Sequence, residues 1–182
     1  MRIIAGTLKG RRLETPDWEG LRPTSDRLRE TLYNVLAPRV AGARVLDGFA
    51  GTGAIGIEAL SRGAAHVTFV ERDARAVRLI ARNLERAGLG GDRHVIIRAD
   101  LASAMRRLAT QPFDIVVLDP PYGAPPLAAA LAAIEPLIGE ETLLVLEHAR
   151  RDPAPALHGA LERTRELTSG DSSLAFYRAR RP

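Results

Sequence analysis

The chain has 182 residues, 46% of them hydrophobic and 26% charged, a length and balance typical of one folded domain with its own core. Because it contains no cysteine, a disulfide framework, a thiolate zinc site and a cysteine nucleophile are excluded. Lys and Arg outnumber Asp and Glu by 26 to 22, and the excess lies at the two ends of the chain. This distribution favours a polyanion, such as a nucleic acid, as a binding partner.

Apolar segments are short throughout. The longest stretch without a charged residue, residues 120–134, holds four prolines and falls short of the ~20 apolar residues of a membrane-spanning helix. The first residues contain no apolar run long enough for a signal peptide. The four histidines show no metal-ligand spacing, and His148, beside Glu147 at a strand end, is expected to serve packing. We therefore expect a monomeric, cytoplasmic protein with no membrane contact and no metal.

The first forty residues differ in pattern from the rest. Two short strands are predicted, at residues 2–5 and 8–13, each close to a glycine turn. A helix is predicted next, with Thr24 or Ser25 as its N-cap and Pro38 as its end. We therefore expect a small N-terminal hairpin followed by an amphipathic helix.

This N-terminal segment is also strongly basic. Four basic side chains and no acid occur in its first twelve residues, namely Arg2, Lys9, Arg11 and Arg12. Such a cluster can bind phosphate groups, although a solvated surface carries similar charge in many proteins. These four residues are therefore candidates for contact with nucleic acid, within an N-terminal extension of residues 1–40 that precedes the main domain of residues 41–182.

From residue 43 onward, short apolar runs alternate with helical stretches. The apolar runs are 43–47, 66–70, 94–98, 114–118 and 142–147. The helical stretches are 54–62, 73–87, 101–109 and 126–138. Alternation of this kind predicts an α/β fold with a mostly parallel sheet and helices on both faces. Residues 161–168 and 174–178 predict an antiparallel C-terminal hairpin, so that the sheet would have seven strands.

A glycine-rich loop follows the first of these strands. Gly51, Gly53 and Gly56 match the pattern GxGxxG, in which glycine lets the backbone turn sharply and approach a ligand. Glu71 lies twenty residues after Gly51, at the end of the next strand, where an acid can accept hydrogen bonds from ribose hydroxyls. A phosphate-binding P-loop is excluded because its lysine is missing. The loop therefore predicts either a dinucleotide or an adenosine cofactor without phosphates.

Two further acids help to decide between these cofactors. Asp47 precedes the loop at a strand end, where its charge disfavours a pyrophosphate and favours an ammonium group. Asp100 ends the third strand and can either accept from an adenine amine or cap the following helix. Together with Glu71, these acids favour S-adenosylmethionine as the cofactor.

The tetrapeptide Asp119-Pro120-Pro121-Tyr122 follows the fourth strand, at the sheet edge where parallel sheets bind ligands. Two prolines stiffen the turn that carries Asp119 and Tyr122. An aspartate that accepts the hydrogens of an exocyclic base amine makes that nitrogen a better nucleophile, and a tyrosine ring can stack on a flipped base. The four residues are therefore the predicted catalytic site, against the alternative of a proline-capped strand end.

These features together resemble a known class of enzymes. The segment DGFAGTGAIGIEALSRGA (47–64), with Glu71, Asp100 and DPPY (119–122), resembles the Rossmann-fold S-adenosylmethionine-dependent amino-methyltransferases of nucleic acids. The resemblance implies a Rossmann-like methyltransferase fold.

The N-terminal region narrows the resemblance. The segments MRIIAGTLKGRRL (1–13) and RPTSDRLRETLYNVL (22–36) are similar to the bacterial 16S ribosomal RNA guanine-N2 methyltransferase family. Membership implies methyl transfer from S-adenosylmethionine to the exocyclic N2 of a guanine in 16S rRNA, at position 966 in the usual bacterial rRNA numbering. The partner would be that RNA or the small ribosomal subunit.

The resemblance also implies roles for individual residues. Gly51 and Gly53 would lie under the methionine end of the cofactor, Glu71 would bind its ribose, and Asp100 its adenine. The tetrapeptide 119–122 would bind the target base.

Arg22 and Thr24 would lie beside the carboxylate of the cofactor. Arg22 has the alternative of a phosphate or surface contact. Gly48 stands where this family more usually has a larger residue, which leaves the backbone there to be determined.

Other functions remain open on the residues alone. A DNA adenine-N6 methyltransferase could carry the same tetrapeptide, although guanine offers adjacent N1–H and N2 donors that suit an acceptor-only aspartate better. An NAD-dependent oxidoreductase could use the glycine loop and Glu71. A non-enzymatic RNA-binding module could rest on the basic N-terminal segment.

Overall fold

The computed structural model describes residues 1–19, 24–108, 112–123 and 126–180. The helices are α1 (Asp26–Val40), α2 (Ala54–Ser61), α3 (Ala74–Arg86), α4 (Leu101–Leu108), α5 (Leu127–Ile134) and the short 3₁₀ helix η1 (Glu135–Leu137). The strands are β1 (Arg44–Gly48), β2 (His66–Glu71), β3 (His94–Arg98), β4 (Ile115–Leu118), β5 (Leu143–Ala149), β6 (Leu157–His158), β7 (Leu161–Ser169) and β8 (Ser172–Ala179). None of the helices in these ranges has the length and apolar character needed to cross a membrane.

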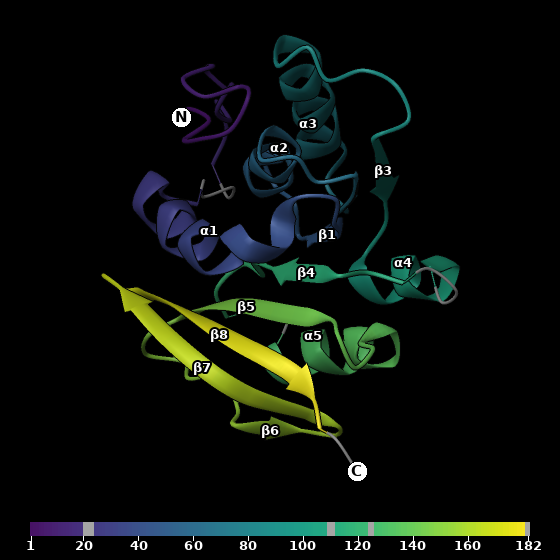
Figure 1. Ribbon diagram of the computed structural model, residues 1–182. Coiled ribbons are helices and arrows are strands. Elements are labelled where there is room, and N and C mark those ends of the chain that lie inside the picture. Colours follow the sequence, from purple (N-terminus) through teal and green to yellow (C-terminus); the bar gives the residue numbers. More distant parts are fainter. Residues whose placement is uncertain (20–23, 109–111, 124–125, 181–182) are drawn as a thin grey trace.

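The strands form a single twisted sheet in the order β3-β2-β1-β4-β5-β8-β7-β6 (Figure 1). Strands β1 to β5 pair in parallel, and β8, β7 and β6 add an antiparallel edge. The strand order reverses between β1 and β4, and α/β sheets bind ligands beside such a reversal, at the carboxyl ends of the strands.

The predicted α/β class, parallel sheet and C-terminal hairpin are confirmed, whereas the predicted number of strands is wrong. Within the described residues the sheet has eight strands, because Leu157–His158 pair with the start of β7. A two-residue strand is too short to show alternation in the sequence, so its pairing depends on the strand beside it.

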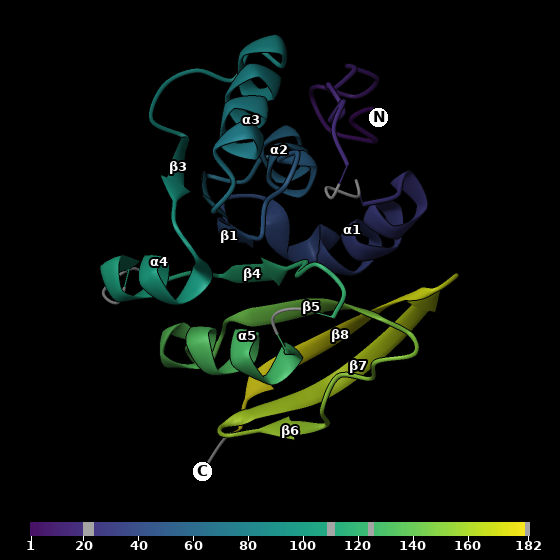
Figure 2. The same ribbon diagram turned by 180° about the vertical axis from the view of Figure 1, so that it is seen from behind.

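Alternate residues of the strands enter two separate cores. Val45 and Val117 pack on one face of the sheet with residues of α1, α2 and α3. Leu46 and Leu118 pack on the other face with residues of α4 and α5. Figures 1 and 2 show these two groups of helices on opposite sides of the central strands. The expected coverage of both faces is therefore confirmed.

The predicted N-terminal hairpin is present only as a short, irregular antiparallel pairing. Its two halves are joined by an isolated antiparallel bridge between Arg2 and Arg12 and by backbone hydrogen bonds, among them Ile3 N–H to the Arg11 carbonyl at 2.9 Å. The backbone N–H groups of Ile4 and Ala5 instead donate to the Glu58 carboxylate of α2, at 2.8 and 2.9 Å. The Glu58 side chain thus binds the two residues that follow the backbone pairing.

Helix α1 begins as predicted but ends later than predicted. Ser25 is its N-cap, since its hydroxyl accepts the Leu28 N–H at 3.1 Å. The helix continues past Pro38 to Val40. Proline removes one helical hydrogen bond near the helix end, but Val40 is 1% exposed and belongs to the core, so its burial favours two more helical residues.

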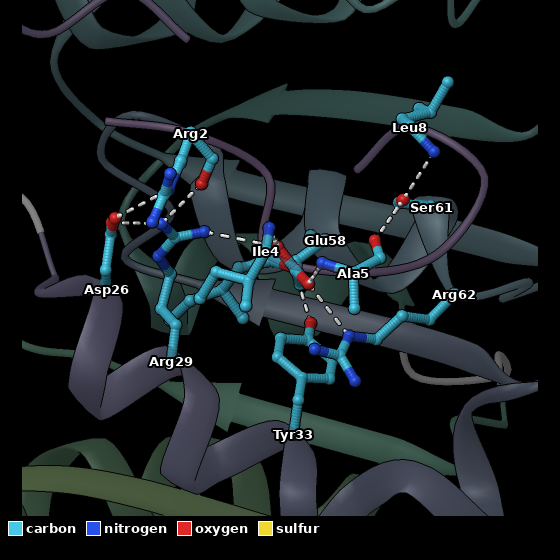
Figure 3. A network of polar contacts seen from close by, with 12 residues as sticks. Arg2, Ile4, Ala5, Leu8, Asp26, Arg29, Tyr33, Glu58, Ser61 and Arg62 are labelled. Carbon is cyan, nitrogen blue, oxygen red and sulfur yellow. Dashed lines mark hydrogen bonds and ion pairs between the residues drawn. The ribbon is translucent and has the colours of Figure 1, made fainter. Parts of the chain in front are cut away.

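A buried polar network fixes the N-terminal segment and α1 to α2 (Figure 3). Arg29 and Glu58 are both fully buried, with Nη1 and Oε2 3.4 Å apart. Arg29 also contacts Asp26 at 2.6 Å and donates to the Arg2 carbonyl at 2.7 Å, while Glu58 accepts from Arg62 at 2.9 Å. Because Glu58 belongs to α2, the helix that follows the glycine loop, this network joins the basic N-terminal segment to that helix.

Candidate active site

A cavity of about 780 Å³ opens at the carboxyl ends of the parallel strands, within the usual size range of small-ligand sites. It is lined by residues from the glycine loop, from the ends of β2, β3 and β4, from β5 and from the N-terminal region. They include Trp18, Thr24, Phe49, Gly51, Glu71, Asp100, Asp119, Pro120, Pro121, Tyr122, Glu147 and Ser172. The structure therefore brings the predicted cofactor loop and the predicted catalytic tetrapeptide to one site.

The backbone of the glycine loop favours glycine at two points. Gly51 and Gly53 have φ values of 57° and 77°, a left-handed conformation that glycine adopts at no steric cost. A Cβ on Gly53 would also lie 3.2 Å from the Ile80 side chain. Gly48 is explained similarly, because a Cβ there would lie 2.5 Å from Leu118 Cδ2.

Glu71 closes this loop from the end of β2. One carboxylate oxygen accepts the Gly51 N–H at 3.0 Å, and the other accepts the Asp73 N–H at 2.8 Å. Two backbone N–H groups thus hold the Glu71 carboxylate at the edge of the cavity. In this orientation it can accept hydrogen bonds from ribose hydroxyls.

Asp100 caps α4. Its carboxylate accepts the Ser103 N–H at 2.9 Å and the Ser103 hydroxyl at 2.7 Å, and these hydrogen bonds lower the pKa of Asp100. The capping interpretation is confirmed. A contact with adenine stays a prediction, which the place of Asp100 on the cavity wall allows.

Asp47 lies beneath the loop instead of lining the cavity. It is 1% exposed, and its carboxylate accepts the Gly56 N–H at 2.8 Å. Burial raises the pKa of Asp47 well above its usual value, with smaller contributions from Asp119 and Glu71. The acid therefore supports the start of α2, and a direct contact with a cofactor ammonium group stays a prediction.

This placement predicts the effect of Asp47→Asn on stability. Asparagine keeps an acceptor for the Gly56 N–H but removes the cost of a buried charge. Because the pKa is raised on folding, that cost is absent below about pH 4 and grows as pH rises above it. We expect urea unfolding to show a variant at least as stable as the parent at pH 7 and no such gain at pH 4. A variant that is clearly less stable at pH 7 would contradict this.

Asp119 is oriented by the N-terminal region. The Thr24 hydroxyl donates to Asp119 Oδ2 at 2.5 Å, and the Asp119 N–H donates to the Gly48 carbonyl at 3.2 Å. Thr24, expected beside the cofactor carboxylate, is thus hydrogen-bonded to the predicted catalytic acid. Arg22 lies outside the described residues.

Tyr122 belongs to a second cluster in the same cavity. Its hydroxyl donates to Glu147 Oε1 at 2.8 Å and lies 2.6 Å from Ser172 Oγ. The residue is 38% exposed, so its ring is accessible from the cavity side. Pro120 is buried and Pro121 exposed, both on the cavity wall.

Glu147 is the site residue that the sequence analysis missed. His148, its neighbour, is buried with Nε2 3.0 Å from Glu166, which agrees with the expected packing role. Glu147 could have been predicted from the sequence, because it is an acid near the carboxyl end of a parallel strand. The same pattern identified Asp47, Glu71, Asp100 and Asp119.

The four basic residues at the N-terminus are all exposed. Arg11 has a structural contact as well, because its guanidinium donates to the Ala87 carbonyl at the end of α3, at 2.8 Å. The following chain runs past α3 to the cavity, where the Trp18 ring lies over the Arg75 guanidinium at 5.2 Å from the ring centroid. The basic segment is thus continuous with a wall of the cavity.

Comparison with known proteins agrees with this arrangement. The family described as Conserved hypothetical protein 95 matches residues 1–178. The ribosomal RNA small subunit methyltransferase D of Escherichia coli is 36% identical over 97% of this chain and 89% of its own, and that of Haemophilus influenzae is 43% identical over 67% of this chain and 64% of its own.

Solved structures extend the likeness to three dimensions. The Escherichia coli protein yhhF superposes with a TM-score of 0.84 at 32% identity, covering 100% of this chain and 99% of the other. A Thermus thermophilus hypothetical protein superposes with a TM-score of 0.83 at 29% identity, covering 98% and 99%. Sequence and structure thus agree over nearly the whole length, and the chain belongs to the Conserved hypothetical protein 95 family, that of the ribosomal RNA small subunit methyltransferase D proteins.

Proposed function

We propose that this protein transfers a methyl group from S-adenosylmethionine to the exocyclic N2 of a guanine in 16S rRNA of the small ribosomal subunit. The observation that carries the proposal is the single cavity lined both by the Gly51 loop with Glu71 and Asp100 and by the Asp119–Tyr122 tetrapeptide. A cofactor site and a base site must adjoin if a methyl group is to pass directly between them.

The residues present fit the cofactor. The glycine loop at Gly51 would hold the amino-acid part, Glu71 on its backbone donors the ribose, and Asp100 at the next strand end the adenine. When bound, S-adenosylmethionine supplies a methyl group activated by its sulfonium. The protein has to position the acceptor amine and exclude water, without a covalent intermediate.

Asp119 would orient the acceptor. Its carboxylate, held by the Thr24 hydroxyl, can accept hydrogens of the base amine and favour a pyramidal nitrogen whose lone pair attacks the methyl group. As the nitrogen–carbon bond forms, the methyl–sulfur bond breaks with the thioether as leaving group, and the nitrogen releases one proton to Asp119 or to water. The Tyr122 ring would stack on the flipped base, an interaction worth ~1–3 kcal/mol per base.

The names of the relatives support small-subunit RNA as the substrate. Residues 1–40 would form the RNA-contacting extension and residues 41–182 the methyltransferase domain. We further propose that the protein acts as a cytoplasmic monomer.

Transfer of tritium from labelled S-adenosylmethionine to three acceptors tests the substrate. We expect label in 16S rRNA or in reconstituted small subunits and none in duplex DNA; label in DNA adenine would favour the rival adenine-N6 enzyme. Calorimetric titration should show binding of S-adenosylmethionine and none of NADH. The opposite result would favour an oxidoreductase.

Neutralising basic N-terminal side chains tests the RNA contact. Lys9 and Arg12 are exposed, and their side chains make no hydrogen bond to the part of the chain that the structure describes, whereas Arg11 supports α3. The double variant Lys9→Gln/Arg12→Gln should bind substrate RNA more weakly, with the slope of log affinity against log salt reduced by about 1 to 2. Affinity for S-adenosylmethionine should stay unchanged in calorimetry. A loss of cofactor affinity would mean that the segment is structural.

A further inference from the structure

Glu147 lies on a strand that is buried along its whole length. The residue is 4% exposed, lines the cavity and accepts the Tyr122 hydroxyl through Oε1. Its other oxygen, Oε2, is buried without a hydrogen-bond partner within the part of the chain that the structure describes. A buried carboxylate oxygen without a donor is unfavourable. Oε2 is therefore an acceptor that a donor on a ligand would satisfy once the side chains that cover it shift on binding.

The register of the sheet brings this acid close to Asp119. Strands β4 and β5 are parallel neighbours with Leu118 opposite Leu146, so Asp119 and Glu147 are the next residues on the two chains. Both line the same cavity. Thr24 and Tyr122 each donate a hydroxyl to one of these carboxylates, which fixes their orientation before a substrate binds.

We propose that Glu147 is a specificity-determining residue that accepts the N1–H of the target guanine while Asp119 accepts from its N2 amine. The proposal rests on the function proposed above. Guanine presents N1–H and the N2 amine as adjacent donors, whereas N1 of adenine is an acceptor. An ionised carboxylate can only accept, so Glu147 favours guanine and rejects a base with an acceptor at N1.

The test uses 2-aminopurine, which keeps the exocyclic amine of guanine but has an acceptor at N1. Semisynthetic 16S rRNA with guanine or 2-aminopurine at the methylated position is reconstituted into small subunits, and kcat/KM is measured on both. The parent protein should prefer guanine by about ten- to a hundredfold, the range of one hydrogen bond to a charged group. Glu147→Gln, whose amide can donate to N1, should reduce that preference by about tenfold or more.

The control is Ser172→Ala, which removes the contact with the Tyr122 hydroxyl but keeps the Glu147 carboxylate. We expect its preference for guanine to stay that of the parent. If Glu147→Gln lowers kcat/KM equally on both substrates, Glu147 has only a structural role and the proposal is overturned.

The experiment also distinguishes failure of the role of Glu147 from failure of the proposed function. If Glu147→Gln does not fold, Glu147→Asp retains the charge but withdraws the acceptor by one methylene, and it should likewise lose preference for guanine. An unchanged preference in both variants, with an active parent, overturns the role of Glu147 alone. A parent that methylates no guanine in this RNA overturns the proposed function as well.

Discussion

Replacing Asp119 by alanine is expected to lower kcat for methyl transfer by about a hundred- to ten-thousandfold, the range of a positioned proton acceptor. The carboxylate lies on the cavity wall at the end of β4 and is held there by Thr24. The glycine loop, Glu71 and Asp100 are contributed by other segments, so the cofactor site should survive. The dissociation constant of S-adenosylmethionine, measured by calorimetry, should therefore change little.

The matched control for this variant is Thr24→Val, which keeps the shape of residue 24 and removes the hydroxyl that donates to Asp119. Its loss of kcat should be smaller, about tenfold, as expected for one hydrogen bond. Loss of cofactor affinity equal to the loss of rate in Asp119→Ala would refute the role of Asp119 at the base.

Glu58→Ala is expected to cost about 3–5 kcal/mol of the free energy of unfolding, because it leaves the buried Arg29 guanidinium without one of its partners. The N–H groups of Ile4 and Ala5 lose their acceptor in the same step. Urea denaturation followed by circular dichroism measures the change. The N-terminal segment should also become accessible to proteases, since this carboxylate holds it on α2 (Figure 3).

Glu14→Ala serves as the control. Glu14 also joins the N-terminal segment to the body of the protein, through Arg82 and Arg86, but these ion pairs are largely exposed. Exposed pairs contribute little to stability, so the control should unfold at nearly the denaturant concentration of the parent. Equal losses in both variants would contradict the central place of the buried network.

The repeating part of the fold was predictable because its signals are local. Strands such as Ile115–Leu118 are continuous apolar runs, and helices such as α3 are amphipathic. The N-terminal region was predictable only in part, as a short antiparallel pairing followed by a helix capped by Ser25. Its attachment to α2 depends on Glu58, which lies more than fifty residues away, and no periodicity in residues 2–13 predicts that contact.

The candidate site, too, was predictable only where its signals are local. The glycine loop and DPPY could be found because close backbone approach and a stiff turn require particular residue types. The bond from Thr24 to Asp119 joins residues far apart in the sequence, and the orphan oxygen of Glu147 becomes visible only when burial and partners are known. Asp47 was predicted to bind the cofactor because it lies at the end of a parallel strand. In the structure its carboxylate instead accepts a backbone N–H beneath the loop.

Mass mapping of modified nucleotides in 16S rRNA, from cells with and without this protein, tests the central claim most directly. The account predicts one guanine whose N2 methyl group is lost without the protein and restored by the parent chain, but not by Asp119→Ala. If 16S rRNA from the two kinds of cell carries the same set of methylated guanines, the proposed function is contradicted.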